Sequence, residues 1–400
     1  MRHFSCQCGN ILFFDNSRCV QCGSQVGYDP ASGGMVTVAL ASPFKRCKNG
    51  LDHAVCNWVV PRDGAEPFCP ACALNLIIPD LRIARNLEAW HKIEIAKRRI
   101  LYTLYDLGLH PVGRKQDPRN GLAFDFLRPT PGNNVLTGHD DGIITLNVNE
   151  AEDDQRARLR GELGESYRTL IGHFRHEIGH YYWDRFFTGR TGDDPLMRGF
   201  REIFGDERID YDAAIASHYA NPTPAPPEKF ISSYASAHPW EDWAETWAHY
   251  LHIRDGAETA FNFGLNPEGV PIPFTPFPRE ALALPPGLEW SGSGENETKF
   301  LEELEAWAKL APALNEIVAS LGHEAFYPFV FSVEIARKFL FVHYAVETCR
   351  GCLGQSAGAA LAARTEDIPL AQAKPPRETA LSPQSPVTRQ DPAAEPVGAA

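Results

Sequence analysis

The chain has 400 residues and a formal net charge of −13, a length that suits two domains with one substantial core and excludes a single small module. Its content of 44% hydrophobic and 22% charged residues excludes a mainly disordered chain. The charge is uneven, because residues 1–115 carry 14 basic and 9 acidic side chains (+5), whereas residues 116–400 carry 24 and 42 (−18). These sums exclude polyanion binding over the whole chain but leave open a basic N-terminal partner surface.

The cysteines are concentrated at the start of the chain, where eight of the ten lie within the first 72 residues. They form two groups of four, each ending in a C-x-x-C pair: Cys6, Cys8, Cys19 and Cys22, then Cys47, Cys56, Cys69 and Cys72. Four thiolates make the closed tetrahedral cage that structural Zn²⁺ prefers. We therefore predict a zinc-ribbon domain over residues 1–79 with two structural zinc ions. A redox C-x-x-C pair and a single zinc with spare thiols are the alternatives.

The rest of the chain alternates predicted helices with two short strands, which makes the expected fold class α+β. Apolar spacing predicts helices over residues 80–109, 150–187, 196–219, 240–254, 296–321 and 327–348, and strands over residues 121–126 and 142–148. Residues 221–227 and 267–286 are proline-rich, and the second of these segments is a candidate cover for a cleft. We expect a mainly helical domain with a small sheet over residues 80–354 and a disordered tail over residues 355–400.

The motif with the clearest chemistry is H-E-x-x-H at His176, Glu177 and His180. On a helix the two histidines lie one turn apart on one face, so both imidazoles can bind one zinc ion. Glu177 is adjacent to the first ligand and can accept a proton from a water activated by the metal. The spacing therefore predicts a zinc hydrolase site with Glu177 as general base.

A catalytic zinc needs a third protein ligand. The predicted helix over residues 240–254, which is rich in tryptophan, has two carboxylates on one face, Glu241 and Glu245. One would bind the metal and the other would support a ligand histidine. The pair Asp206 and Glu207 lies closer to His180 in the sequence and is the alternative source of a third ligand or of a supporting group. Residue types alone do not decide which of these carboxylates is the third metal ligand.

The segments HEIGH and EDWAE together resemble the gluzincin branch of the zincin metallopeptidases. With the Cys-rich start and the stretches FRHEIGHYYWDR and FGDERIDY, residues 1–350 resemble a bacterial family of zinc-binding metallopeptidases with an N-terminal zinc ribbon. The resemblance implies a zincin-like fold, Glu241 as the third ligand and Glu245 as the supporting acidic residue. It also implies that Tyr234, seven residues before Glu241, stabilises the oxyanion. In zincins an edge strand before the active-site helix aligns the substrate, and residues 142–148 occupy that place in the order.

Other polar residues have plainer expected roles. His173, about one turn before His176, is expected to pack or to support the site rather than bind metal, and His238 and His249 are expected at the surface or behind the ligands. Cys349 and Cys352 are expected to be reduced thiols at a helix end.

The sequence predicts a zinc-dependent peptidase with one catalytic zinc and two structural ones. Its expected partner is a peptide or protein substrate, with the ribbon as a possible protein-docking surface, and nucleic acid is not expected. The alternatives are a binding protein with an inactive zincin domain and a metal-dependent amidase. No apolar run approaches the ~20 residues needed to span a bilayer, and the first residues lack the features of a signal or transit peptide. We therefore expect a cytoplasmic protein without membrane contact.

Overall fold

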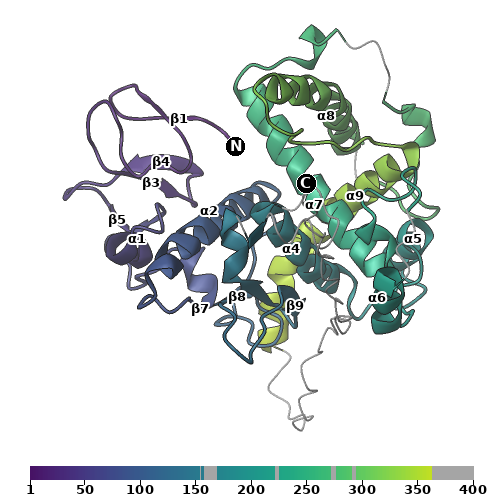
Figure 1. Cartoon of the computed structure of the whole chain (residues 1–400), viewed down its shortest axis with the longest axis horizontal. Helices are drawn as coiled ribbons and strands as arrows, with labels where there is room; N and C mark the ends of the chain where they lie inside the picture. Colours follow the sequence, from purple (N-terminus) through teal and green to yellow (C-terminus); the bar gives the residue numbers. More distant parts are fainter. Residues whose placement is uncertain (154, 157–168, 221–224, 272–275, 291–293, 363–400) are drawn as a thin grey trace, which may run out of the picture.

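The computed structural model of the chain describes residues 1–153, 155–156, 169–220, 225–271, 276–290 and 294–362, with the backbone alone over 351–362. A small lobe of short strands at the N-terminus is followed by a larger, mainly helical body (Figure 1). The predicted fold class, an N-terminal ribbon region followed by a mainly helical part with small sheets, is confirmed. None of the helices in the described ranges combines the length and the apolar character needed to cross a bilayer.

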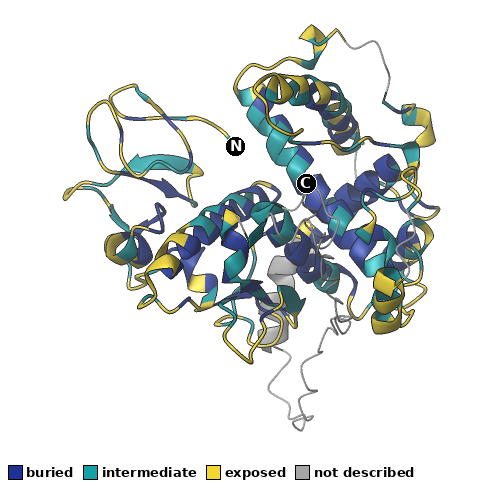
Figure 2. Ribbon diagram, in the orientation of Figure 1, coloured by how far each residue is buried: buried dark blue, intermediate teal, exposed yellow. Residues whose placement is uncertain are grey.

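The N-terminal lobe consists of antiparallel strand pairs. The pairs are β1 (Phe4–Ser5) with β2 (Ile11–Leu12), β3 (Val26–Asp29) with β4 (Gly34–Thr37), and β5 (Phe44–Arg46) with β6 (Val59–Pro61), and α1 (Lys48–His53) lies between the last two strands. Two-stranded pairs are marginally stable on their own, and Figure 2 shows that much of this lobe is exposed or half-buried. The lobe therefore needs another source of stability than its apolar core.

The cysteine-rich region continues directly into the sheet of the larger body. After η1 (Cys72–Leu74), strand β7 (Asn75–Ile77) pairs in parallel with β8 (Ala123–Leu127). The four-stranded sheet has the order β7-β8-β10-β9, with β10 (Ile143–Asn147) parallel to β8 and β9 (Gly138–Asp140) antiparallel to β10. The predicted domain boundary after residue 79 stays a prediction. Strand β7 lies before that boundary, yet it belongs to the same sheet as β8, β9 and β10, which lie after it.

The predicted strand over residues 142–148 forms, but its expected place at the edge of the sheet is wrong. Strand β10 is paired on both sides, with β8 and with β9, and β9 is the strand at that edge. Strand β9 was not predicted, because its three residues, Gly138, His139 and Asp140, include two types that are depleted in strands.

Seven helices follow in the described part of the chain. Their bounds are α2 (Ala84–Asp106), α4 (Leu170–Phe187), α5 (Pro195–Phe204), α6 (Tyr211–Ala220), α7 (Pro239–Asn262), α8 (Glu295–Ser320) and α9 (Val333–Ala362). Helices α4 and α7 pack along each other at the centre, with α2 against α4, and α8 and α9 against α7 (Figure 1). Short 3-10 turns are η2 (Val148–Ala151), η3 (Tyr234–Ser236), η4 (Pro267–Gly269) and η5 (Arg279–Ala281).

Several predicted helix bounds are corrected. The helix expected over residues 196–219 is two helices, because Gly205 has φ 104, a conformation that ends α5. Helix α4 begins at Leu170, where the Thr169 side chain accepts a hydrogen bond from Gly172 N as its cap. Most of the preceding stretch expected to be helical, residue 154 and residues 157–168, lies outside the described residues. Residues 355–362, expected in the tail, belong to α9, and residues 363–400 are also outside the described ranges.

Gly179, inside the H-E-x-x-H segment, permits the close approach of α4 and α7. A Cβ at this position would lie 3.0 Å from Ala244 Cα and 3.1 Å from Trp247 Cβ. We expect Gly179→Ala to lower the free energy of unfolding by about 1–2 kcal/mol, because overpacking outweighs the gain in helix propensity. Thermal unfolding measures the effect, and Gly269→Ala is the control, since no atom lies within 4 Å of its added Cβ. Equal stability of both variants would contradict this account of the helix contact.

Candidate metal centre

The two histidines of the motif converge, as their spacing on α4 predicts. His176 Nε2 and His180 Nε2 lie 3.1 Å apart. Both side chains are buried, at 6% and 4% exposure, so the ring nitrogens face the interior rather than bulk water. Burying two polar rings side by side costs free energy unless their nitrogen atoms have hydrogen-bond partners or bind a metal ion.

Glu241 of α7 brings the third donor atom to the same point. Helix α7 begins at Pro239, with the His238 ring accepting a hydrogen bond from Trp240 N as the cap, so Glu241 stands in its first turn. Glu241 Oε2 lies 3.0 Å from His176 Nε2 and 3.4 Å from His180 Nε2. Donor atoms about 2.0–2.1 Å from a tetrahedral zinc are roughly 3.4 Å from one another. The three atoms therefore fit one zinc ion with a position left for water or substrate.

The electrostatics of Glu241 support a cation at this point. Its Oε2 is buried and accepts no hydrogen bond from the residues described. Burial opposes its charge, but the adjacent imidazoles of His180 and His176 hold the pKa of Glu241 well below its ordinary value. One buried carboxylate oxygen and two ring nitrogens that face one another form a donor set suited to a divalent metal ion.

Further side chains fix the orientation of these ligands. Glu245 Oε1 lies 2.7 Å from His176 Nδ1, and Glu245 Oε2 accepts a hydrogen bond of 2.6 Å from Ser232 Oγ. This is the supporting contact expected of Glu245. The second oxygen of Glu241, Oε1, accepts a hydrogen bond of 2.6 Å from the hydroxyl of Tyr211 on α6. Tyr211 is a site residue that sequence reasoning missed, because no spacing relates it to Glu241, which lies 30 residues further on.

The ring of His180 lies against that of Trp240 instead, with the two rings tilted by 38°. Its Nδ1 has no hydrogen-bond partner among the described residues, and its ring lies 3.8 Å, centroid to centroid, from that of Trp240. Trp240 is half-buried at this contact.

Glu177 lies beside the ligands without joining them. Its side chain is buried, and Glu177 Oε1 lies 3.2 Å from His173 Nε2. Burial raises the pKa of this carboxyl, but the hydrogen bond from His173 and the nearby imidazoles outweigh it, so the pKa of Glu177 lies below its ordinary value. An ionised carboxylate next to a metal position can accept a proton.

Tyr234, on η3, is brought to the same site, with its ring 5.9 Å from that of His176. Burial holds the pKa of Tyr234 well above its ordinary value, so its hydroxyl keeps its proton and can donate a hydrogen bond.

Asp206 and Glu207 are placed differently from the alternative that the sequence left open. Asp206 pairs with Arg208 at 2.7 Å and Glu207 with Arg201 at 2.5 Å, and neither belongs to the group of donor atoms around His176. His249 lies behind the site, where its Nδ1 is 3.0 Å from the hydroxyl of Tyr327.

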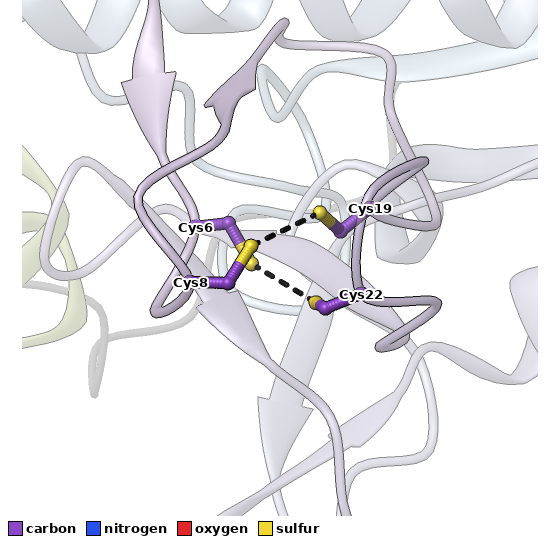
Figure 3. Close-up of side chains that lie close together, drawn as sticks. All are labelled: Cys6, Cys8, Cys19 and Cys22. Atoms are coloured by element: carbon purple, nitrogen blue, oxygen red, sulfur yellow. Dashed lines mark hydrogen bonds between the residues drawn. The ribbon is translucent and has the colours of Figure 1, made fainter.

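The first cysteine group converges in the N-terminal lobe. Figure 3 shows Cys6 and Cys8 from one loop facing Cys19 and Cys22 from another. The Sγ atoms of Cys6 and Cys22 are 3.7 Å apart, as are those of Cys8 and Cys19. Thiolates 2.3 Å from a tetrahedral zinc lie roughly 3.8 Å from one another. The distances therefore fit one zinc ion. Two of these cysteines, Cys6 and Cys19, also belong to a small core cluster with Leu12 and Val26, separate from the main core.

The second group, Cys47, Cys56, Cys69 and Cys72, converges in the main core. Cys56 Sγ and Cys69 Sγ are 3.7 Å apart, and the backbone amide of Trp58 donates to Cys56 Sγ at 3.4 Å. Hydrogen bonds from the other cysteines, with the nearby charge of Arg98, hold the pKa of Cys56 well below its ordinary value. The spacing of the group therefore fits one zinc ion, as that of the first group does.

Glu245→Ala is expected to lower the affinity of the His-His-Glu site for zinc by about 10–100-fold, because the ring of His176 loses the carboxylate that orients it. Competition with a chromophoric chelator measures this affinity. Glu268→Ala, at an exposed position on η4, is the control and should leave it unchanged. Equal affinities in both variants would show that the contact between Glu245 and His176 does not tune the site.

In the described residues, two groups of four cysteines thus precede a group of two histidines and a glutamate, and each group has the geometry of a metal site. Residues 86–345 match a family model described as "Putative zinc-binding metallo-peptidase", and residues 3–83 match a zinc-ribbon domain. The chain belongs to this metallopeptidase family, as the sequence motifs predicted. Uncharacterized proteins of Mycobacterium bovis and of two strains of Mycobacterium tuberculosis are 41% identical over 352 residues, which cover 87% of this chain and 96% of each relative. No solved structure matches the chain.

Proposed function

We propose that the chain is a zinc-dependent peptidase, with one catalytic zinc held by His176, His180 and Glu241 and one structural zinc in each cysteine group. The observation that carries the proposal is the convergence of His176 Nε2, His180 Nε2 and Glu241 Oε2 next to a buried carboxylate that is not a ligand, Glu177. A metal alone can be structural, but an open coordination position beside an ionised base is the arrangement of a hydrolase.

Each side chain of the site has a different role in the proposed peptide hydrolysis. A bound zinc supplies Lewis acidity, which makes water a nucleophile at neutral pH and polarises a carbonyl. Glu177 accepts the proton of the attacking water and returns it to the leaving amine. The hydroxyl of Tyr234 donates a hydrogen bond to the oxygen on which negative charge develops. Glu245 and Tyr211 keep His176 and Glu241 in the geometry that the reaction needs.

The sheet offers a place for an extended substrate. Strand β9 pairs with β10 on one side alone in the four-stranded sheet, and it packs against α4, the helix that carries the motif. An edge strand presents main-chain N–H and C=O groups to which a peptide can add as a further strand. We therefore propose a peptide or an unfolded segment of a protein as the substrate, aligned by β9 rather than by β10.

Metal analysis joined to substrate profiling tests the proposal. We expect wild-type chain to contain three zinc ions and His176→Ala to contain two, because each ligand set is independent of the others. Zinc-loaded wild type should cleave members of a broad peptide library, lose that activity with a chelator and regain it with added zinc. A chain that holds three zinc ions and cleaves no peptide would contradict the proposal and favour a binding protein.

A further inference from the structure

A histidine that is not a ligand joins two buried carboxylates next to the metal centre. His173 and Glu177 are one turn apart on α4, and His173 Nε2 lies 3.2 Å from Glu177 Oε1. The other ring nitrogen, His173 Nδ1, lies 2.6 Å from Glu150 Oε2 on η2. We propose that Glu150 and His173 are positioning residues that hold Glu177 in the orientation needed for proton transfer. This inference rests on the proposed peptidase function and assigns a role to two residues outside it.

The contacts continue from Glu150 into the sheet. Glu150 Oε1 accepts a hydrogen bond of 2.5 Å from Thr137 Oγ1. Thr137 Oγ1 in turn accepts one of 2.9 Å from the backbone amide of Asn147, the last residue of β10. The orientation of Glu150 is therefore set by the backbone of the sheet, and that of His173 by Glu150. This series of contacts connects Glu177 to the backbone of the four-stranded sheet.

Geometry distinguishes this arrangement from ordinary packing. An imidazole has two nitrogen atoms at fixed angles, so a ring with a carboxylate at each nitrogen is fixed in both rotation and translation. Because Glu177 Oε1 is taken by His173, Glu177 Oε2 remains for the water that the base must deprotonate. Catalytic groups need placement within about 0.5 Å, which neighbouring hydrogen bonds provide. A buried carboxylate without such a partner would also carry a desolvation cost.

The kinetic test uses the zinc-loaded full chain and separates kcat from KM. We expect His173→Gln and Glu150→Ala to lower kcat about 10–100-fold, with KM and zinc content unchanged, as for other outer-shell partners. Glu150→Gln keeps an acceptor oxygen for His173 and should recover most of the loss in kcat. The matched control is His343→Gln, another buried histidine, whose Nδ1 lies 3.0 Å from the hydroxyl of Tyr250. A kcat within twofold of wild type in both His173→Gln and Glu150→Ala would overturn the proposal.

A second measurement needs no activity. In zinc-loaded chain with ¹⁵N-labelled histidine, a hydrogen-bonded ring N–H gives a downfield proton signal in NMR. We expect one His173 signal to shift in Glu177→Gln and another in Glu150→Gln, and both to vanish in His173→Gln. A spectrum that Glu177→Gln leaves unchanged would overturn the proposal. A chain that shows these shifts but cleaves no peptide would overturn the proposed function and leave the contact of His173 with Glu177 established.

Discussion

Glu177→Gln is expected to abolish peptide hydrolysis while zinc stays bound to His176, His180 and Glu241. The glutamine amide has nearly the same shape and can still accept a hydrogen bond from His173, but it cannot take a proton from water. Loss of a positioned general base lowers kcat by about 10²–10⁴-fold. The measurement is kcat on a cleaved library peptide together with the zinc content of the same sample.

Two further variants give this prediction its controls. Tyr234→Phe should lower kcat less, by roughly 10²-fold or below, because one hydrogen bond to the oxyanion is lost while the base remains. Glu316→Gln, on α8 and outside the donor group, should leave kcat unchanged. If Glu177→Gln retained more than a tenth of the wild-type kcat with full zinc content, another group would have to be the base.

Cys56→Ser is expected to destabilise the whole chain, whereas Cys22→Ser is expected to affect the N-terminal lobe alone. Cys56 belongs to the main hydrophobic core together with Trp58 and Trp90 of α2. Cys22 and Cys8 are exposed, and the other two cysteines of the group, Cys6 and Cys19, lie in a separate small cluster. We therefore expect zinc in the two cysteine groups to stabilise different amounts of structure, although the ligand types are the same.

Buried charges enlarge the effect of Cys56→Ser. Arg98, 2% exposed, donates to Val55 O at 2.6 Å, and Glu94 and Lys97 form an ion pair of 2.9 Å with no exposed surface. Four thiolates around one Zn²⁺ carry a net charge of −2, and the positive charge of Arg98 lies close enough to lower the pKa of Cys56. Removing one partner of a buried charge lowers the free energy of unfolding by about 3–5 kcal/mol. Loss of the zinc ion lowers it further.

Calorimetry with metal analysis tests this difference. We expect the main unfolding transition of Cys56→Ser to fall by about 10 °C or more, with one zinc lost. Cys22→Ser should also lose one zinc but keep the main transition within a few degrees of wild type. Equal shifts in the two variants would show that both sites stabilise the same cooperative unit.

The fold class and the grouping of the candidate ligand residues were predicted from the sequence, whereas the contacts around the candidate site were not. The donor atoms of His176, His180 and Glu241, and those of both cysteine groups, come together as expected. Such predictions succeed because a metal restricts ligand types and spacing strongly, and because residues one turn apart on a helix share a face wherever that helix lies.

What the sequence missed depends on contacts between distant segments. Tyr211, Ser232 and Thr137 reach the site through hydrogen bonds that no local pattern encodes. Strands β7 and β9 have three residues each, too few for an alternation to be read. The edge of the sheet was assigned to residues 142–148 from their place in the order of elements, and that order does not show which strands pair, since pairing partners are set by tertiary structure.

The pairing of β7 with β8 has a consequence for how this protein can be dissected. A shortened chain that starts at α2 would lack the outer strand of the sheet and would leave the partner edge of β8 open. It would also expose the faces of Trp90 and Ile93 that share a core with Cys56, Cys69 and Leu74. Such a fragment would be prone to aggregate through its free strand edge. Because the ribbon is synthesised first, the nascent chain has this strand available before the rest of the sheet emerges.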